Sequence, residues 1–248
     1  MKNIKLVIVY DGTSYLGWQK TPAGPSIEES LERALETILQ HKVVLQAASR
    51  TDAGVHANGQ VVNFLTDKEN LKLDRLQISL NQLLTTGIVI LKAEEAATSF
   101  HPTLDCLQKE YRYFICRGFV QMPEHRNYSW YCPRLHLISE MRTAKNLFIG
   151  KLDFSALCNL KNQQHYDGYV REVFAIDMED LSSDRLVIKI RGQNFLYKMV
   201  RNIVGTLAYV GMGKITLQQL PTILSSHDRT QAGITAPAHG LFLHHVTY

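Results

Sequence analysis

Cysteine is scarce in this sequence, and no two cysteines are spaced as a pair. The 248 residues contain four, which are Cys106, Cys116, Cys132 and Cys158. The absence of a Cys-x-x-Cys pair excludes zinc-ribbon and thioredoxin-type sites. Scattered cysteines without a signal peptide are typical of reduced, buried thiols. We therefore expect a cytoplasmic protein with no disulfides.

Long apolar runs are missing as well. The strand-like run from Ile4 to Tyr10 is too short for a secretory or membrane-spanning segment, and no later run approaches the required length. The chain also lacks a phosphate-binding glycine loop and any His/Cys ligand spacing. We expect no membrane attachment, and the sequence shows no motif for a nucleotide cofactor or a metal ion.

Charge of one sign is only slightly in excess. The formal net charge is +4, with 45% hydrophobic and 20% charged residues, which is ordinary for a globular protein. This balance permits an anionic partner without requiring one. A chain of this length buries roughly 70% of its unfolded surface, so a metal or disulfide staple is not needed for stability.

The first half of the chain alternates strand and helix patterns. Branched residues from Ile4 to Tyr10 predict a strand. Ser26, followed by Glu29, predicts a capping box at the start of a helix. The remaining patterns predict strands at residues 43–47, 60–64 and 88–92 and a helix around residues 73–83.

The second half repeats the rhythm. Its patterns predict strands at residues 111–116, 170–178, 186–190 and 241–246 and helices at residues 139–149 and 196–210. Gly211 is expected to end the second of these helices. Thr216 and Gln219 predict a capping box before a further short helix.

Each half therefore runs strand, helix, strand, strand, helix, strand, which is the order of the ferredoxin-like split β-α-β unit. We predict an α+β fold in which two such halves form an extended mixed sheet with helices on one face. No low-complexity linker separates the halves. The predicted boundary lies near residues 97–105, giving halves at 1–105 and 106–248.

The polar segment from Ser49 to His56 carries the strongest chemical signal. It lies between two predicted strands, so sheet holds both of its ends, and polar residues on such loops are often functional. Gly54 permits a tight turn that exposes Asp52, and Arg50 places a cation beside that carboxylate. On these residues alone, an Asx-turn that only caps backbone amides remains an alternative.

Five segments, in the same order along the chain, resemble the TruA family of tRNA pseudouridine synthases. The most specific is Arg50-Thr51-Asp52-Ala53-Gly54-Val55-His56, followed by Gln60-Val61-Val62. The others are Tyr10-Asp11-Gly12 with Gly17-Trp18-Gln19, Ser99-Phe100-His101 with Glu110-Tyr111-Arg112-Tyr113, Asn194-Phe195-Leu196-Tyr197 with Met199-Val200-Arg201-Asn202, and Thr235-Ala236-Pro237 with Gly240-Leu241. Together they span nearly the whole chain.

The resemblance implies that Asp52 is the catalytic aspartate. Such enzymes break the N1–C1′ bond of uridine, turn the base and rejoin C5 to C1′, which needs neither cofactor nor metal. A carboxylate can attack C6 of the base, assist at C1′ or transfer a proton, and the sequence does not choose among these roles.

Three further residues match functional positions of the family. Tyr111 matches a tyrosine that stacks on the target base, although from the residues alone it is a strand residue that packs the core. Arg201 matches an arginine that pairs with the aspartate, where the alternative is a solvent-facing helix residue. Arg50 matches an arginine that helps to extrude the base, and a simple phosphate contact is its alternative. His56 is interpreted as a hydrogen-bonding scaffold residue.

The chain departs from the family pattern at a few positions. Ser49 stands where glycine is usual, and serine fits there if its φ is negative. Pro102-Thr103 replaces a usual Ala-Arg, which removes a cation expected near the RNA or the active-site wall. Glu110 stands where the family tends to be basic or neutral. These changes bear on RNA affinity and site preference more than on the reaction.

The resemblance also implies the partners: tRNA, modified at uridines 38, 39 and 40 of the anticodon stem-loop, and a second copy of the chain in a homodimer. The scattered Lys and Arg residues suit recognition of overall tRNA shape, but charge alone does not distinguish them from an ordinary surface. Three alternatives remain: a synthase for another RNA site, a catalytically silent tRNA-binding or chaperone protein, and a ferredoxin-like small-molecule enzyme.

Overall fold

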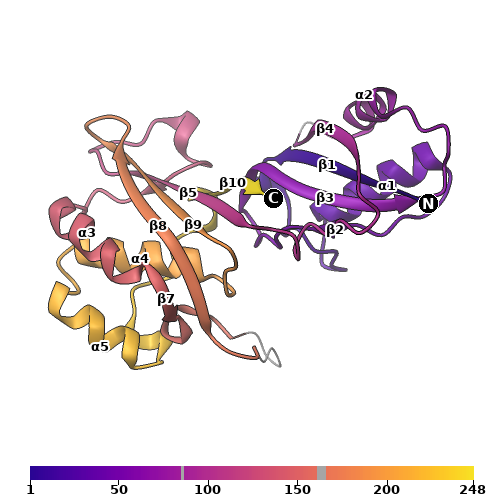
Figure 1. The fold of residues 1–248 in the computed structure, drawn as a ribbon. Coiled ribbons are helices and arrows are strands. Elements are labelled where there is room, and N and C mark those ends of the chain that lie inside the picture. Colours follow the sequence, from indigo (N-terminus) through magenta and orange to yellow (C-terminus); the bar gives the residue numbers. More distant parts are fainter. Residues whose placement is uncertain (85–86, 161–165) are drawn as a thin grey trace. The chain divides into compact units, whose positions relative to one another are not determined.

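The computed structural model describes residues 1–84, 87–160 and 166–248 (Figure 1). It divides into two compact units. The first unit comprises Met1–Leu107 together with Phe242–Tyr248, and the second comprises Gln108–Leu241. The second unit is thus inserted in the sequence between two parts of the first.

The first unit has the split β-α-β order. Its elements are β1 (Lys2–Tyr10), α1 (Ile27–Leu39), β2 (Gln46–Ala47), β3 (His56–Thr66), α2 (Leu73–Leu83), β4 (Ile88–Ala96) and β10 (Leu241–Thr247). The strands lie in the order β4-β1-β3-β2, and each neighbouring pair is antiparallel. β10 runs parallel to β3 and pairs Phe242 with His56 and Leu243 with Ala57.

Alternation along β1 explains which face of this sheet is buried. Ile4, Leu6 and Ile8 are fully buried, whereas Lys5 and Val7 on the opposite face are half-buried. The apolar sides of α1 and α2 cover the buried face, and the two helices also contact each other. Burying each such aliphatic side chain stabilises the fold by about 1.5–3 kcal/mol.

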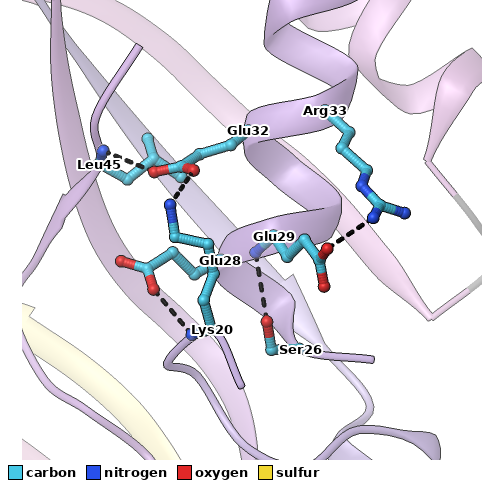
Figure 2. A network of polar contacts seen from close by, with 7 residues as sticks. All are labelled: Lys20, Ser26, Glu28, Glu29, Glu32, Arg33 and Leu45. Carbon is cyan, nitrogen blue, oxygen red and sulfur yellow. Dashed lines mark hydrogen bonds and ion pairs between the residues drawn. The ribbon is translucent and has the colours of Figure 1, made fainter. Parts of the chain in front are cut away.

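The start of α1 is fixed by the residue that the sequence indicates. Ser26 Oγ accepts from the backbone N–H of Glu29 at 3.3 Å (Figure 2). The reciprocal half of the predicted capping box is not seen, because the Glu29 carboxylate pairs with Arg33 one turn later. Ser26 therefore caps α1 as predicted, but Glu29 does not complete the capping box.

The next turn of α1 ties two distant segments together. Glu32 accepts from Lys20 Nζ at 2.5 Å and from the backbone N–H of Leu45 at 3.2 Å, as Figure 2 shows. Glu28 accepts from the backbone N–H of Lys20 at 2.9 Å. One helix face thereby anchors both the segment before α1 and the approach to β2.

The second unit also layers helices on an antiparallel sheet. Its elements are β5 (Gln108–Cys116), β6 (Trp130–Tyr131), α3 (Ile138–Ala144), β7 (Gly150–Asp153), β8 (Val170–Asp180), β9 (Arg185–Gly192), α4 (Met199–Gly211) and α5 (Leu220–Ser225). The strands lie in the order β5-β9-β8-β7, and β6 runs parallel beside β5. α3 and α4 pack against each other.

Several predicted boundaries differ from the structure. The strand predicted at residues 43–47 is reduced to β2, and the helix predicted at 139–149 ends at Ala144 and continues as a 3₁₀ turn over Lys145–Phe148. β6 and β7 were not predicted, because runs of two and four residues carry too little periodicity to be recognised. The capping box at Thr216 and Gln219 is confirmed, and it opens a 3₁₀ turn before α5.

The prediction that the helix ends at Gly211 is confirmed, although Gly211 is not a cap in the left-handed conformation. Gly211 is the last residue of α4, and the positive φ of +70° falls two residues later, at Gly213. Gly211 is needed for packing instead, since a Cβ there would lie 2.3 Å from Met141 Sδ and 2.8 Å from Leu135 Cδ2. A glycine required by a close contact resembles a helix stop in the sequence alone.

The predicted α+β class with mixed strand pairing is confirmed. Parallel pairs occur between β10 and β3 and between β5 and β6. The pairs β1–β3, β1–β4, β2–β3, β5–β9, β7–β8 and β8–β9 are antiparallel. None of the helices in the described part of the chain has the length and apolar character needed to cross a membrane.

Candidate active site

Asp52 lies on a short loop between β2 and β3 and is half-buried. The backbone N–H of Val55 donates to the Asp52 carbonyl oxygen at 3.1 Å, which closes a tight turn. Gly54 within this turn has a φ of +77°, a value that few residues other than glycine adopt. The glycine therefore permits the turn that presents the carboxylate, as the sequence predicts.

The segment between β1 and α1 supports this loop from behind. Thr51 is buried, its Oγ1 lies 2.7 Å from Tyr10 Oη, and its carbonyl oxygen accepts from the backbone N–H of Trp18 at 3.0 Å. Gly17, at a φ of +96°, approaches so closely that a Cβ would lie 2.7 Å from Thr51 O. The position of the residue before Asp52 is thus fixed by both backbone and side-chain contacts.

A side-chain amide holds the entrance of the loop. Gln60 Nε2 donates to Ser49 O at 2.6 Å, and the Ser49 N–H donates to Gln60 Oε1 at 3.3 Å. Ser49 is not among the described residues with positive φ, so serine fits at the position where the family usually has glycine. Two hydrogen bonds between Gln60 and the backbone of Ser49 thus hold the start of the loop against β3.

His56 closes the other end of the loop and is 1% exposed. Its Nδ1 accepts from the backbone N–H of Gly12 at 3.1 Å, lies 3.2 Å from Asp11 Oδ1, and its ring stacks on Phe242. These contacts join the loop to the end of β1 and to β10. They agree with the interpretation of His56 as a scaffold residue.

Arg50 is exposed, whereas the next residue, Thr51, is buried. Its side chain is therefore accessible to solvent beside the loop. An exposed arginine next to a fixed carboxylate is suited to contact a polyanion.

Tyr111 lies on β5 in the second unit, and Tyr113 lies two residues later on the same face. Tyr111 is 6% exposed, and its ring forms a T-shaped pair with the ring of Phe195, with centroids 5.3 Å apart and planes at 88°. Edge-to-face packing of this kind fixes the plane of a tyrosine ring. The Tyr111 ring therefore has a defined orientation at the start of β5.

Arg201 lies in the first turn of α4, and a strap formed by residues 233–240 holds it. Arg201 Nε donates to Ala236 O at 2.7 Å, and the backbone N–H of Ala236 donates back to Arg201 O at 3.1 Å. The strap also reaches β5, where Tyr113 Oη donates to Pro237 O at 2.8 Å. Arg201 is thereby held at its side chain and its backbone by one residue of the strap.

The charge of Arg201 affects two neighbouring groups. Burial raises the pKa of Tyr113 well above its ordinary value, and the nearby Arg201 opposes that rise. Burial lowers the pKa of His239, and Arg201 lowers it further, against a hydrogen bond with the Ser129 backbone. Both groups are therefore neutral near pH 7, and Arg201 is the cation of this cluster.

Comparison with known proteins decides the family. The family model described as tRNA pseudouridine synthase matches residues 6–104 and 144–248. The chain belongs to the tRNA pseudouridine synthase family. It is an isomerase that converts uridine to pseudouridine in tRNA, as members of this family do, and the predicted family and enzyme class are confirmed.

Relatives of this synthase cover its whole length. A "tRNA pseudouridine synthase A 2" of Protochlamydia amoebophila is 57% identical over 248 residues, covering 100% of this chain and 95% of the relative. A "tRNA pseudouridine synthase A" of Thermoanaerobacter sp. is 40% identical and covers 100% of both chains. Among solved structures, a Cbf5–Nop10–Gar1 complex matches with a TM-score of 0.39 at 10% identity, covering 82% of this chain and 44% of that chain.

The predicted site residues of the synthase fall into two groups. Arg50 and Asp52 lie in the first unit, and Tyr111 and Arg201 lie in the second. The pairing of Asp52 with Arg201 stays part of the proposal below. Within the described residues, no group of three or more His, Cys, Asp or Glu side chains could hold a metal ion.

Sequence reasoning missed the residues that support this site. Tyr10 and Gln60 brace the Asp52 loop, and the strap braces Arg201. All of them fall in segments that resemble the family, but a match to a motif does not say which side chains contact one another. Thr235-Ala236-Pro237 was noted only as a matching end of the chain.

Proposed function

We propose that this synthase modifies uridines 38, 39 and 40 in the anticodon stem-loop of tRNA, with Asp52 as the catalytic carboxylate. The observation that carries the proposal is the Asp52 loop, which has the family signature and is braced at its base, its back and its far end. Because the loop is braced on three sides, it holds the Asp52 carboxylate in place for a reaction that turns the base within the site.

The chemistry rearranges bonds within one nucleotide. The N1–C1′ bond breaks, the detached base turns, and a C5–C1′ bond forms. The hydrogen on C5 leaves to solvent as a proton, and N1 takes up a proton, so the product is an isomer of the substrate. Asp52 acts on this rearrangement, and Arg201 orients the carboxylate.

Tyr111 and Arg50 are proposed to act on the flipped nucleotide. Removing a base from its stack costs a few kcal/mol. Stacking on the Tyr111 ring returns about 1–3 kcal/mol, and the edge contact from Phe195 holds that ring in place. Arg50, exposed beside Asp52, contacts the RNA and favours the extruded base.

The decisive experiment measures tritium released from tRNA that carries 5-tritiated uridine. We expect release by the native chain and none by Asp52→Asn, with tRNA binding retained. Asp67→Asn is the matched control, because its side chain is 84% exposed in the same unit, and it should release tritium normally. No release by the native chain from any tRNA would refute the proposal.

Substrates with a single uridine at position 38, 39 or 40 test the site assignment. Release from all three supports it, whereas pseudouridine mapped only to other positions or other RNAs favours the synthase for a different site. If Asp52→Asn supports tRNA folding in cells as well as the native chain does, the result favours the alternative of a catalytically silent tRNA chaperone. We also propose that the protein is cytoplasmic. We further propose that it is a homodimer, which sedimentation of the purified chain tests.

A further inference from the structure

Asn202, on α4, is fully buried and uses its entire hydrogen-bonding capacity. Its Nδ2 donates to Leu157 O at 2.7 Å and to Asn159 Oδ1 at 2.8 Å. Its Oδ1 accepts from Thr235 Oγ1 at 2.7 Å and from Arg229 Nη2 at 2.9 Å. Since a carboxamide has two donor hydrogens and two acceptor positions, this amide cannot turn without breaking four bonds.

The same contacts fix the strap in register with the helix. Thr235 and Ala236 are consecutive residues of the strap, and they bond to Asn202 and Arg201, which are consecutive residues of α4. Close backbone packing reinforces the register, because a Cβ at Gly205 would lie 1.6 Å from the carbonyl oxygen of the strap residue before Thr235. The strap cannot slide along α4 without losing these bonds together.

Arg229 completes the network from a 3₁₀ turn at Arg229–Gln231. Its Nη2 donates both to Asn202 Oδ1 and to Thr235 Oγ1, the latter at 3.0 Å. In the described part of the chain no carboxylate lies in ion-pair range of Arg229, its Nε is buried without a partner, and burial lowers its pKa. A guanidinium held only by neutral oxygens serves to fix their positions.

We propose that Asn202, Thr235 and Arg229 are positioning residues for the reaction, and that they act by orienting the Arg201 guanidinium. This inference rests on the proposed function, in which Arg201 orients the catalytic carboxylate. A guanidinium is planar, so the bond from Arg201 Nε to Ala236 O sets the plane in which both terminal nitrogens lie. The network sets the place of Ala236 and therefore the direction of the arginine fork.

The first test replaces Thr235 with valine in the full-length chain, which removes the hydroxyl at nearly constant volume. We expect turnover of 5-tritiated tRNA to fall about 10- to 100-fold while KM stays within about twofold, since a small misplacement of a catalytic group affects turnover most. Thr235→Ser keeps the hydroxyl and should restore most of the turnover. Thr66→Val is the matched control, because Thr66 is 2% exposed in the first unit and its hydroxyl bonds to His41.

A double-mutant cycle separates positioning from a general loss of stability. If Thr235 acts through Arg201, then Thr235→Val combined with Arg201→Gln turns over no more slowly than Arg201→Gln alone. Effects that multiply would overturn the inference. So would equal losses of turnover in Thr235→Val and Thr66→Val, or a serine variant that is no better than valine.

Arg229→Lys probes the network without altering the strap or α4, which matters if Thr235→Val folds poorly. Lysine keeps the charge and loses the fork, so turnover should fall at unchanged KM. A raised KM with normal turnover and a weaker salt dependence of binding would instead make Arg229 a phosphate contact and overturn the inference. Absence of tritium release by the native chain is a separate outcome, which removes the proposed function and this inference with it.

Discussion

The two units hold their proposed functional residues in different ways, although both are built from strand–helix–strand order. In the first unit, Asp52 sits on a loop that is fixed mainly by backbone bonds and two glycines with positive φ, Gly17 and Gly54. In the second, Arg201 sits on a regular helix and depends on a strap distant in sequence. The loop depends mainly on backbone bonds and close backbone approach, whereas the second arrangement requires side chains from three segments to meet.

This difference teaches where tolerance to substitution should lie. The Asp52 loop should be sensitive to changes that strain its backbone contacts. The position of Arg201 should be sensitive to side chains that do not touch Arg201 itself. Four variants test the comparison, in order of decreasing expected effect.

The largest effect is expected for Gly205→Ala, which drives a Cβ to 1.6 Å from the Ile234 carbonyl oxygen. Strap and helix must separate, so we expect a loss of about 3 kcal/mol or more in the free energy of unfolding, measured by urea denaturation. Gly150→Ala is the control, since a Cβ there meets nothing within 4 Å and only its φ of +111° opposes alanine. Equal losses in the two variants would contradict the close contact.

Tyr10→Phe tests the brace behind the Asp52 loop. It removes the 2.7 Å bond to Thr51 Oγ1, and we expect a loss of about 1 kcal/mol in stability, measured by the same denaturation. Turnover should fall by more than the native fraction alone explains, because the residue before Asp52 loses a fixed contact. Tyr131→Phe, which loses a bond between an exposed hydroxyl and Phe119 O, is the control and should leave turnover unchanged.

His239→Gln tests the electrostatics of the strap. Burial holds the pKa of His239 below its ordinary value of about 6.5, so the unfolded chain binds a proton first as pH falls. The native chain should therefore lose stability as pH drops from about 6.5 toward the lowered pKa and level off below it. His239→Gln should show a flatter dependence of melting temperature on pH over that window. A slope identical to that of the native chain would contradict the assignment, and His245→Gln, exposed on β10, is the control.

The smallest effect is expected for Arg33→Gln. The Arg33 side chain is 77% exposed and pairs with Glu29 one turn earlier on α1. Such a pair contributes about 0.2–0.5 kcal/mol, so the melting temperature should barely change and the tritium assay not at all. A large change would mean that the start of α1 supports the Asp52 loop more strongly than its exposed contacts indicate.

The sequence predicts what is local, as particular residues show. Ser26 caps α1 because an N-cap depends on a side chain and an amide three residues away. Gly54 permits the Asp52 turn for a similarly local reason. The packing role of Gly211, in contrast, escaped prediction because the close approach of Met141 cannot be inferred from neighbours in the chain.

The supporting residues of the site escaped prediction for the same reason. Thr235 and Arg229 lie more than twenty residues from Asn202 in sequence, and no periodic pattern relates them. The bond between Tyr10 and Thr51 likewise spans 41 positions. A family motif marks such residues as members of matching segments, but only the folded chain shows which side chains they contact.

The pairing of β10 with β3 has a consequence for synthesis on the ribosome. β10 belongs to the first unit but is translated after the whole second unit, so β3 must wait for its parallel neighbour while more than a hundred residues are added. Domains commonly fold as they emerge during translation, and the second unit can do so first. The ring of His56, at the end of the Asp52 loop, gains its stacking partner Phe242 only at that late stage. A nascent chain would therefore carry the Asp52 loop without this stacking contact until β10 has been translated, after the whole second unit.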